Sequence, residues 1–298
     1  MIRLDRLITL ALFRPLARLT NYKGVRIPIL MYHGISRDVE ERVHPYYKIA
    51  TTPEVFGQHM AMLVERGCQV IGLDAAIKLL RRDNNVLQGM PTQPVVITFD
   101  DGYLDFYTNA YPVLARHGFT ATVFLPTAFI DSGNRKTAGK TFLSWPQVRE
   151  LADCGVSFGS HTTSHGYLLE KTGAEMEQEM RLSKETIEEK TGNAVRFFSY
   201  PFAFPEHDKR FVAVLRNTLQ TCGYSCAVTT SIGTATQGDD LLSLKRLPIN
   251  ASDDLALLGA KIIGGYDWMH TAQYTVKAIR GMLGLRKRNR SGQWASLA

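Results

Sequence analysis

The stretch that decides the fold is residues 94–102, which read P-V-V-I-T-F-D-D-G. The first six are mostly apolar and β-branched, which is typical of a strand buried on both faces. The run ends on two adjacent carboxylates, Asp100 and Asp101, and a glycine. Asp-Asp-Gly is also a common turn sequence, but two carboxylates at the end of a buried strand are costly unless their charge is compensated. A bound dication would compensate it, so the stretch predicts a buried strand that leads into a metal site.

Similar apolar runs alternate with helical patterns along the rest of the chain. We expect strands at residues 27–32, 69–71, 94–99, 120–125, 156–159, 196–200, 225–228 and 242–249. Helices are expected at residues 53–66, 74–80, 108–117, 146–154, 174–190 and 208–222. This alternation predicts an α/β fold with a parallel sheet, closed or nearly closed as a (β/α) barrel. An open doubly wound sheet is the alternative, although no G-x-G-x-x-G follows the first strand.

Composition and charge limit the class of protein. The chain has 298 residues, 45% apolar and 21% charged, which excludes disordered, collagen-like and coiled-coil proteins. Its net charge is +7, distributed as +5 over residues 1–26, −4 over residues 27–276 and +6 over residues 277–298. A mildly acidic body does not favour nucleic-acid binding, so no nucleic-acid partner is expected. Four cysteines lie scattered without a C-x-x-C pair, which favours reduced thiols over disulfides: Cys68, Cys154, Cys222 and Cys226.

The basic ends divide the chain into three regions. We expect a basic amphipathic segment at 1–23, one domain at 24–275 and a basic tail at 276–298. The apolar run at 7–13 is too short for a spanning helix, and no small-residue cleavage site follows it. We therefore expect a cytoplasmic protein. Its basic ends would contact the anionic inner face of the membrane, or else be solvated.

Residues that suit catalysis follow several of the expected strands, at the end where barrel enzymes place their sites. His33 follows the first strand, Asp100 and Asp101 follow the third, and His161 and His165 follow the strand at 156–159. On one helical turn, the spacing of the two histidines would place both imidazoles on one face, as metal binding needs. A structural or surface histidine pair is the alternative. Together with one aspartate, the two histidines would form a set of metal ligands that leaves coordination positions open for water and substrate. The other aspartate would then be free to act as a base.

Two motifs resemble the signatures of a known family. T-F-D-D-G-Y at 98–103 and S-H-T-T-S-H at 160–165 are similar to the first two motifs of the polysaccharide deacetylases, carbohydrate esterase family 4. The resemblance covers roughly residues 27–250. It implies a distorted (β/α)₇ barrel in a single domain and one divalent metal ion, usually zinc. The implied metal ligands are Asp101, His161 and His165, and the implied general base is Asp100.

The same resemblance implies a reaction and a substrate. Hydroxide formed on the metal would attack the acetamide of an N-acetylated (GlcNAc-type) polysaccharide or oligosaccharide, releasing acetate and a free amino sugar. We place Pro201, Phe202 and Tyr103 in the group that contacts the substrate or its oxyanion, because the Phe202 N–H can donate to a developing oxyanion.

The third motif departs from the family pattern. F-S-Y-P-F-A at 198–203 has Ser199 where the family has an arginine that orients the base, and Phe202 where it has tyrosine. We expect Arg246, on a late strand, to supply the missing charge; a surface arginine is the alternative. The fourth motif, rich in Asp and Trp, is not recognisable at 224–230.

The general acid also departs from its usual place. The family's C-terminal Leu-x-His is missing, but L-M-Y-H at 30–33 ends the first strand with a comparable pattern. This resembles the circularly permuted poly-N-acetylglucosamine deacetylases, in which that histidine comes first. We therefore expect His33 to be the general acid. His270 lies beyond the last expected strand, in a segment where we expect no comparable anchor.

Three other functions stay open. A small-molecule amidase of the same fold would use the same site residues. A catalytically degenerate glycan-binding relative would explain the missing arginine and fourth motif. Non-haem iron oxygenation also uses two histidines and one carboxylate, but it does not explain the second aspartate.

Overall fold

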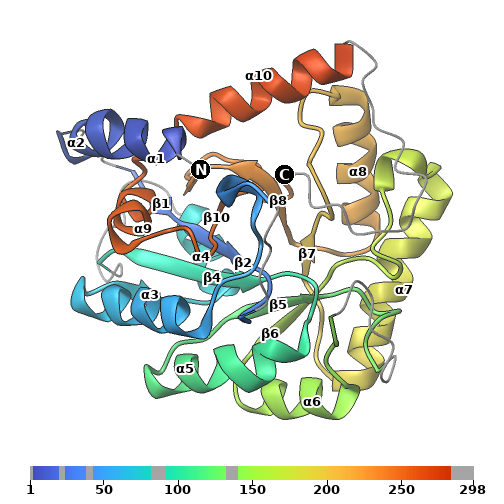
Figure 1. Ribbon diagram of the computed structural model, residues 1–298. Coiled ribbons are helices and arrows are strands. Elements are labelled where there is room, and N and C mark those ends of the chain that lie inside the picture. The colour runs from blue at the N-terminus through green and yellow to red at the C-terminus, as the bar shows by residue number, and fades with distance from the viewer. Residues whose placement is uncertain (1–2, 20–23, 38–42, 82–91, 132–139, 283–298) are drawn as a thin grey trace.

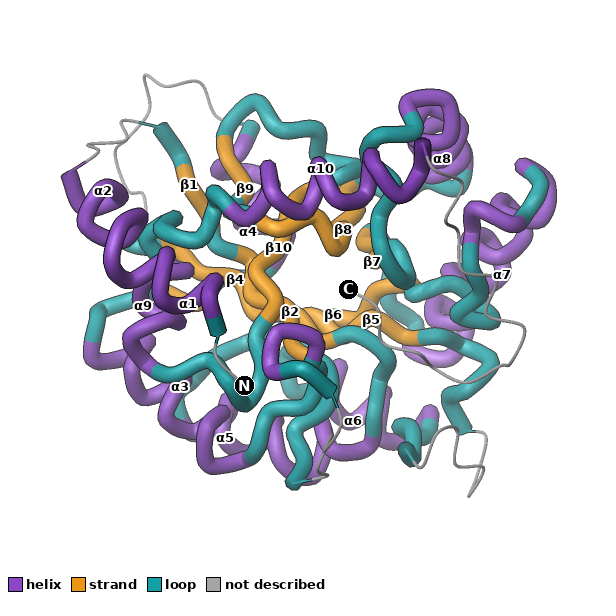
Figure 2. The backbone as a smooth tube through the Cα atoms, turned by 45° about the horizontal axis from the view of Figure 1, so that its top comes forward, coloured by secondary structure: helices purple, strands orange, loops and turns teal. Residues whose placement is uncertain are grey.

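A closed ring of seven parallel strands forms the centre of the molecule, with helices around it (Figures 1 and 2). The computed structural model describes the chain except for residues 1–2, 20–23, 38–42, 82–91, 132–139 and 283–298. The strands are β2 (Ile29–Tyr32), β4 (Pro94–Phe99), β5 (Thr122–Leu125), β6 (Ser157–Ser160), β7 (Phe197–Ser199), β8 (Cys226–Ile232) and β10 (Leu244–Pro248). Around the ring the order is β2-β10-β8-β7-β6-β5-β4, and pairing of β4 with β2 closes it. The expected single-domain α/β barrel is therefore confirmed, and the open sheet was the wrong alternative.

Three short strands lie outside this ring. β1 (Arg26–Ile27) pairs antiparallel with β9 (Ala235–Thr236), and β3 (Gln69–Val70) pairs with the start of β4. The expected first strand is interrupted at Pro28, which has no N–H to donate to a sheet ladder. β1 and β2 therefore have different partners.

Helices cover the outside of the barrel. They are α3 (Pro53–Glu65), α4 (Leu73–Leu80), the π-helical turn η3 (Phe106–Ala110) with α5 (Tyr111–Arg116), α6 (Trp145–Asp153), α7 (Gly173–Thr191), α8 (Lys209–Thr221), α9 (Leu255–Ile262) and α10 (Met269–Met282), with short 3₁₀ turns η2 (Pro45–Tyr47) and η4 (Leu168–Glu170). Thr52 caps α3, accepting a hydrogen bond from the Val55 N–H, as its place before Pro53 predicts. α4 begins at Leu73, one residue before the expected start; Gly72 is its N-cap, and Asp74 lies in the first turn.

The barrel interior changes character along its length. Alternation along β4 places Val96, Thr98 and Asp100 on one face, and alternation along β10 places Leu244 and Arg246 on one face. Val96 and Leu244 belong to an apolar cluster that also contains Ile29, Phe124, Cys226 and Val228. Towards the carboxyl ends of the strands, the same faces carry polar and charged side chains. The interior is thus apolar at one end and ionic at the other.

The N-terminal residues form a helical stretch attached to the barrel's outer layer. It comprises α1 (Leu4–Ile8), the π-helical turn η1 (Thr9–Phe13) and α2 (Arg14–Leu19). Arg3 pairs with Asp253 before α9, and Phe13 stacks on Trp268 before α10. α10 crosses the boundary expected between residues 275 and 276. No helix among the described residues is both long enough and apolar enough to cross a membrane, and the four cysteines are free.

Candidate metal centre and active site

The strand register brings the expected site residues to one end of the barrel. Tyr32 pairs with Phe99, so the residues after β2 and β4 leave the sheet side by side. Ser160 pairs with Leu125 and with Phe198, so the ends of β5, β6 and β7 are level as well. The residues at these ends are His33, Asp100, Asp101, His161, His165, Pro201 and Phe202.

Asp101, His161 and His165 form a buried triangle of ligand atoms. The two Nε2 atoms are 3.1 Å apart, and Asp101 Oδ1 lies 3.2 Å from His165 Nε2 and 3.6 Å from His161 Nε2. Ligands about 2.0–2.1 Å from a tetrahedral zinc ion lie about 3.3 Å from one another. Among the described residues, Asp101 Oδ1 accepts no hydrogen bond although it is buried. The residues present therefore fit a divalent metal ion.

The two histidines do not lie on a helix, so the expected reason for their proximity was wrong. Residues 161–167 form an irregular loop in which Thr162 has φ +66° and His165 has φ +51°. The Thr162 hydroxyl accepts a hydrogen bond of 3.0 Å from the His165 N–H, which closes the loop. Left-handed residues other than glycine cost of order 1–3 kcal/mol each and cluster at functional sites.

A second left-handed turn separates the two adjacent aspartates. Asp101 has φ +73° and Gly102 has φ +62°. A Cβ on residue 102 would lie 2.6 Å from Leu125 Cδ2, so only glycine fits there. Because of this turn, Asp101 is directed at the histidines whereas Asp100 is directed at a different partner.

Hydrogen bonding and burial set the protonation of the ligand triangle. The His161 Nδ1–H donates to the Ser199 carbonyl at 2.8 Å, which directs the bare Nε2 towards Asp101. Burial lowers the pKa of His161 to about 4, so its ring is neutral at pH 7. Burial acts to raise the pKa of Asp101, but the contact with His165 outweighs it and lowers the pKa below its ordinary value. A neutral imidazole and an ionised carboxylate are the forms that bind a metal.

Arg246 holds Asp100 through two parallel hydrogen bonds. Nη1 donates to Asp100 Oδ1 at 2.8 Å, and Nη2 donates to Oδ2 at 2.7 Å. The remaining donors are also used, at the Thr229 carbonyl and the hydroxyls of Thr98 and Ser199. Burial acts to raise the pKa of Asp100, but the Arg246 charge outweighs it and the pKa is lowered. Asp100 is thus a fixed, ionised carboxylate, and Arg246 is no surface arginine.

The residues expected to contact the substrate lie in two different environments. Phe202 follows the buried Pro201, has φ +60°, and its ring packs edge-on against His165 at 4.7 Å. Within the described part of the chain, its N–H donates no hydrogen bond. Tyr103 instead packs in the core against Phe142 and is 6% exposed. The expected contact of Tyr103 with substrate stays a prediction.

The two histidines considered as general acid lie in different places. His33 Nε2 is 4.0 Å from Asp100 Oδ2, and its side chain is partly exposed. His270 lies on α10, with Nε2 2.9 Å from Glu206 Oε2. Gln273 anchors α10 to β8 by accepting from the Ile232 N–H and donating to the Thr230 carbonyl. The expectation that this segment lacks an anchor was therefore wrong.

Glu179 on α7 is a site residue that the sequence reasoning missed. Its Oε2 accepts from the N–H groups of Thr163 and Ser164 at 3.0 and 2.9 Å, and Oε1 accepts from the Ser164 hydroxyl at 2.6 Å. Lys171 pairs with the same carboxylate. Glu179 therefore fixes the loop that carries His165. The Glu-rich exposed face of this helix contained no signal that separates Glu179 from its neighbours.

Comparison with known proteins places the chain in a family. Residues 88–225 match the family model "Polysaccharide deacetylase". The chain is 30% identical over 241 residues to YxkH of Bacillus subtilis, which is named as a polysaccharide deacetylase; the match covers 80% of this chain and 77% of that protein. It is 24% identical to the poly-beta-1,6-N-acetyl-D-glucosamine N-deacetylase of Escherichia coli K12, over 76% of this chain but only 37% of that protein.

A solved structure agrees with this assignment. The Streptococcus pyogenes deacetylase PplD in complex with acetate is 25% identical and superposes with a TM-score of 0.68, over 80% of this chain and 99% of that one. Two motifs at strand ends on the same side of the barrel, the closed barrel and these matches agree with one another, and the chain belongs to the polysaccharide deacetylase family.

Proposed function

We propose that this protein is a metal-dependent N-deacetylase that removes acetyl groups from a GlcNAc-type polysaccharide or oligosaccharide. The observation that carries the proposal is the placement of two adjacent aspartates in separate roles. Asp101 completes a triangle with His161 and His165, whereas Asp100 is held ionised by Arg246. Two relatives bear the names of a polysaccharide deacetylase and of a poly-N-acetylglucosamine deacetylase, which supports this substrate class.

The ligand triangle would hold the metal, which we propose to be zinc. A dication bound there supplies acidified water and a polarised acetyl carbonyl. Asp100 lies beside the triangle and accepts the proton that the attacking water loses. Arg246 keeps this carboxylate ionised and aimed, because both of its oxygens are occupied by guanidinium N–H groups.

Two further groups serve the acyl transfer. The Phe202 N–H donates to the oxygen on which negative charge develops, a role that depends on the backbone and tolerates the absence of tyrosine. His33 donates a proton to the departing amine, since its Nε2 lies 4.0 Å from Asp100 Oδ2 and its side chain is partly exposed. His270, paired with Glu206, takes no part in this scheme.

The placement of Arg246 counts against the alternative that this protein is a catalytically degenerate glycan-binding relative. That alternative depended in part on Ser199 in the third motif, where the family has arginine. Arg246 reaches the same aspartate from β10, and the Ser199 hydroxyl donates to Asp100 as well. The carboxylate of the base is therefore supported, and a catalytic role is the better explanation.

Acetate release tests the proposal. The purified protein is assayed on β-1,6- and β-1,4-linked N-acetylglucosamine oligomers and on N-acetylglucosamine itself, with and without a chelator. We expect release from oligomers that the chelator abolishes and added zinc restores. Asp100→Asn is the inactive control. Turnover of the monosaccharide alone would favour the small-molecule amidase, and metal binding without release from any substrate would favour the glycan-binding protein.

A further inference from the structure

The N-terminal helical stretch turns most of its charged side chains and Phe13 towards the barrel and leaves six large apolar side chains exposed. The exposed positions between residues 4 and 19 are Leu4, Leu7, Ile8, Ala11, Leu12, Pro15, Leu16, Arg18 and Leu19. Exposure of the large ones ranges from 40% at Ile8 to 80% at Leu19. A helix on the surface of a globular protein ordinarily shows the opposite arrangement. The face therefore needs an apolar partner.

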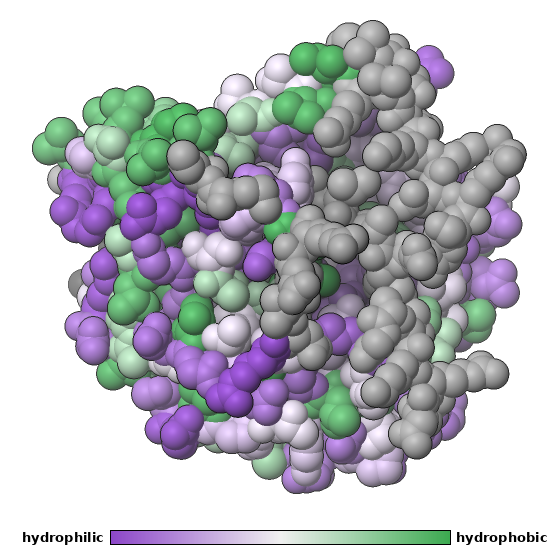
Figure 3. Space-filling model, viewed as in Figure 1, coloured by the Kyte–Doolittle hydropathy of each residue, from purple (hydrophilic) through white to green (hydrophobic). Residues whose placement is uncertain are grey.

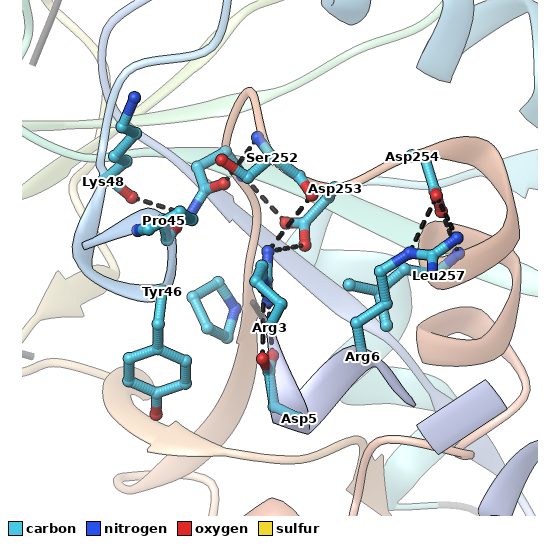
Figure 4. A network of polar contacts seen from close by, with 12 residues as sticks. Arg3, Asp5, Arg6, Pro45, Tyr46, Lys48, Ser252, Asp253, Asp254 and Leu257 are labelled. Carbon is cyan, nitrogen blue, oxygen red and sulfur yellow. Dashed lines mark hydrogen bonds and ion pairs between the residues drawn. The ribbon is translucent and has the colours of Figure 1, made fainter. Parts of the chain in front are cut away.

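Ion pairs and hydrogen bonds hold the helix in this orientation (Figure 4). Arg3 pairs with Asp253 at 2.9 Å, and Arg6 pairs with Asp254. Beyond the view of that figure, the Trp268 indole N–H donates to the Thr9 hydroxyl at 3.0 Å. The Arg3 pair is buried, the Thr9 contact is half-buried and the Arg6 pair is exposed, and together these contacts hold the stretch with its leucines outward.

Apolar exposure is concentrated at this corner of the molecule. Of the fourteen large apolar side chains that are exposed among the described residues, six lie on residues 4–19 and three on α10, which are Tyr274, Val276 and Ile279. The Phe13–Trp268 stack joins the two helical regions. Figure 3 shows apolar side chains gathered over α1 and α2 and again on α10. We name the exposed side chains of residues 4–19 and of α10 the apolar ridge.

The charge around the apolar ridge selects among partners. The only charged residue exposed between residues 4 and 19 is Arg18, and Arg14 beside it is half-buried. Residues 1–26 carry +5 overall and residues 277–298 carry +6, whereas the body between them carries −4. A second copy of the chain would bring the same cations to the contact, and the like charges would repel. An anionic surface would attract them.

We propose that the apolar ridge docks on an anionic lipid surface, with the helix of residues 4–19 lying in the plane of the interface. The sixteen residues extend about 24 Å, and the leucines would enter the boundary between headgroups and acyl chains. Arg14 and Arg18 would contact lipid phosphates, each basic residue adding an attraction that salt screens. This proposal does not depend on the catalytic one, since it concerns a different surface.

Vesicle co-sedimentation tests the proposal on the full chain. We expect binding to phosphatidylcholine vesicles that contain about 30 mol% phosphatidylglycerol, with weaker binding to phosphatidylcholine alone and at high salt. The triple substitution Leu7→Ser, Leu12→Ser and Leu16→Ser should lower the partition coefficient about tenfold or more. The matched control is Val64→Ser, Leu182→Ser and Val214→Ser, which removes exposed apolar side chains elsewhere and should leave the partition coefficient unchanged.

Further experiments distinguish an anionic lipid surface from a second copy of the chain. Arg18→Glu should weaken binding to the anionic vesicles, whereas Arg116→Glu, at another exposed position, should not. All variants should keep the wild-type melting temperature. The proposal is overturned if the wild-type protein binds neither vesicle, or if both triple variants lose binding equally. It is also overturned if sedimentation velocity shows a wild-type dimer that only the ridge variant dissociates, since the partner is then a second copy.

Discussion

Arg246 and Asp100 are 146 residues apart in the chain and form a two-bond ion pair inside the barrel, with both side chains buried. Each charge is buried only because the other is present. Every donor of the guanidinium has an acceptor within the ring of strands. The pair thus couples the stability of the barrel to the protonation state of the group that we propose as the general base.

Removal of the arginine should destabilise the fold. Arg246→Gln leaves a buried carboxylate without its counter-charge, which costs about 3–5 kcal/mol in the free energy of unfolding. Urea denaturation measures this. The double variant Arg246→Gln with Asp100→Asn should recover much of the loss, because no ionised group is then left unpaired. Equal destabilisation in both variants would mean that lost packing, and not lost charge, is responsible.

The two adjacent aspartates should respond differently to substitution. Asp101→Asn and His161→Ala should lose bound metal and acetate release together, because each removes a ligand atom of the triangle. Asp100→Asn should keep the metal and lose turnover. Elemental analysis of purified protein beside the rate assay separates the two outcomes, with His117→Ala as a histidine control. Equal metal loss in the Asp100 and Asp101 variants would contradict the division of roles.

His33→Ala should lower the rate of amide hydrolysis by about 10²–10⁴-fold with metal content intact, as expected for loss of a positioned general acid. The loss should shrink for an activated aryl acetate ester, whose leaving group needs no proton. His270→Ala should stay within a few-fold of wild type. Steady-state rates on both substrates measure this, and a His270 variant that is inactive with metal bound would reverse the assignment.

Glu179→Gln should weaken metal binding without touching a ligand. The substitution removes the charge that accepts hydrogen bonds from Thr163 and Ser164, and loss of such an outer partner typically costs 10–100-fold in metal affinity. Competition with a chromogenic chelator measures the affinity. Glu177→Gln, at an exposed position on the same helix, is the matched control and should leave it unchanged. An unchanged affinity in Glu179→Gln would show that the loop holds its shape without this contact.

The packing of the N-terminal helix against the rest of the protein should be lost in acid. Burial acts to raise the pKa of Asp5, but hydrogen bonds from Arg3 and Tyr266 outweigh it, so the pKa lies below its ordinary value of 3.8. A carboxylate with a lowered pKa stabilises the fold above its unfolded pKa, and that stability is lost as the pH falls through the folded value. Hydrogen-exchange protection of residues 4–19, corrected for intrinsic rates, should stay constant from pH 7 to 5 and fall below about pH 4. Asp5→Asn should lower it at pH 7, and a fall already between pH 7 and 5 would implicate a histidine instead.

The barrel was readable from the sequence because its signals are local. The run at 94–99 gave the bounds of β4 as the structure has them. On α7, the buried side chains recur at the helical period, so the buried face can be read from the sequence: Met176, Met180, Ser183 and Ile187. Parallel topology places the carboxyl ends of the strands at one end of the barrel, and this predicts that the aspartates lie near the histidines.

What the sequence did not reveal depends on contacts between distant residues. His161 and His165 are brought together by a left-handed loop that Glu179 clamps, and helical spacing predicted the proximity for the wrong reason. The amphipathic pattern of residues 1–23 did not indicate which face is inward. That choice is made by Asp253 and Asp254, about 250 residues away, because their charges attract the arginines rather than the leucines.

The Ser199–Arg246 contact has a wider consequence for comparing members of this family. In a closed ring, side chains that project into the lumen from different strands converge on the same point, so a functional cation can be contributed by either β7 or β10 without changing its position in space. In a sequence alignment, such an exchange looks like the loss of the third-motif arginine, although the Asp100 carboxylate still has an arginine beside it. The reciprocal exchange, Ser199→Arg with Arg246→Ser, is therefore a meaningful engineering target. For homologues that lack the arginine in one motif, the charged side chains that all strands project into the barrel are therefore a better guide to activity than the residues of any single strand.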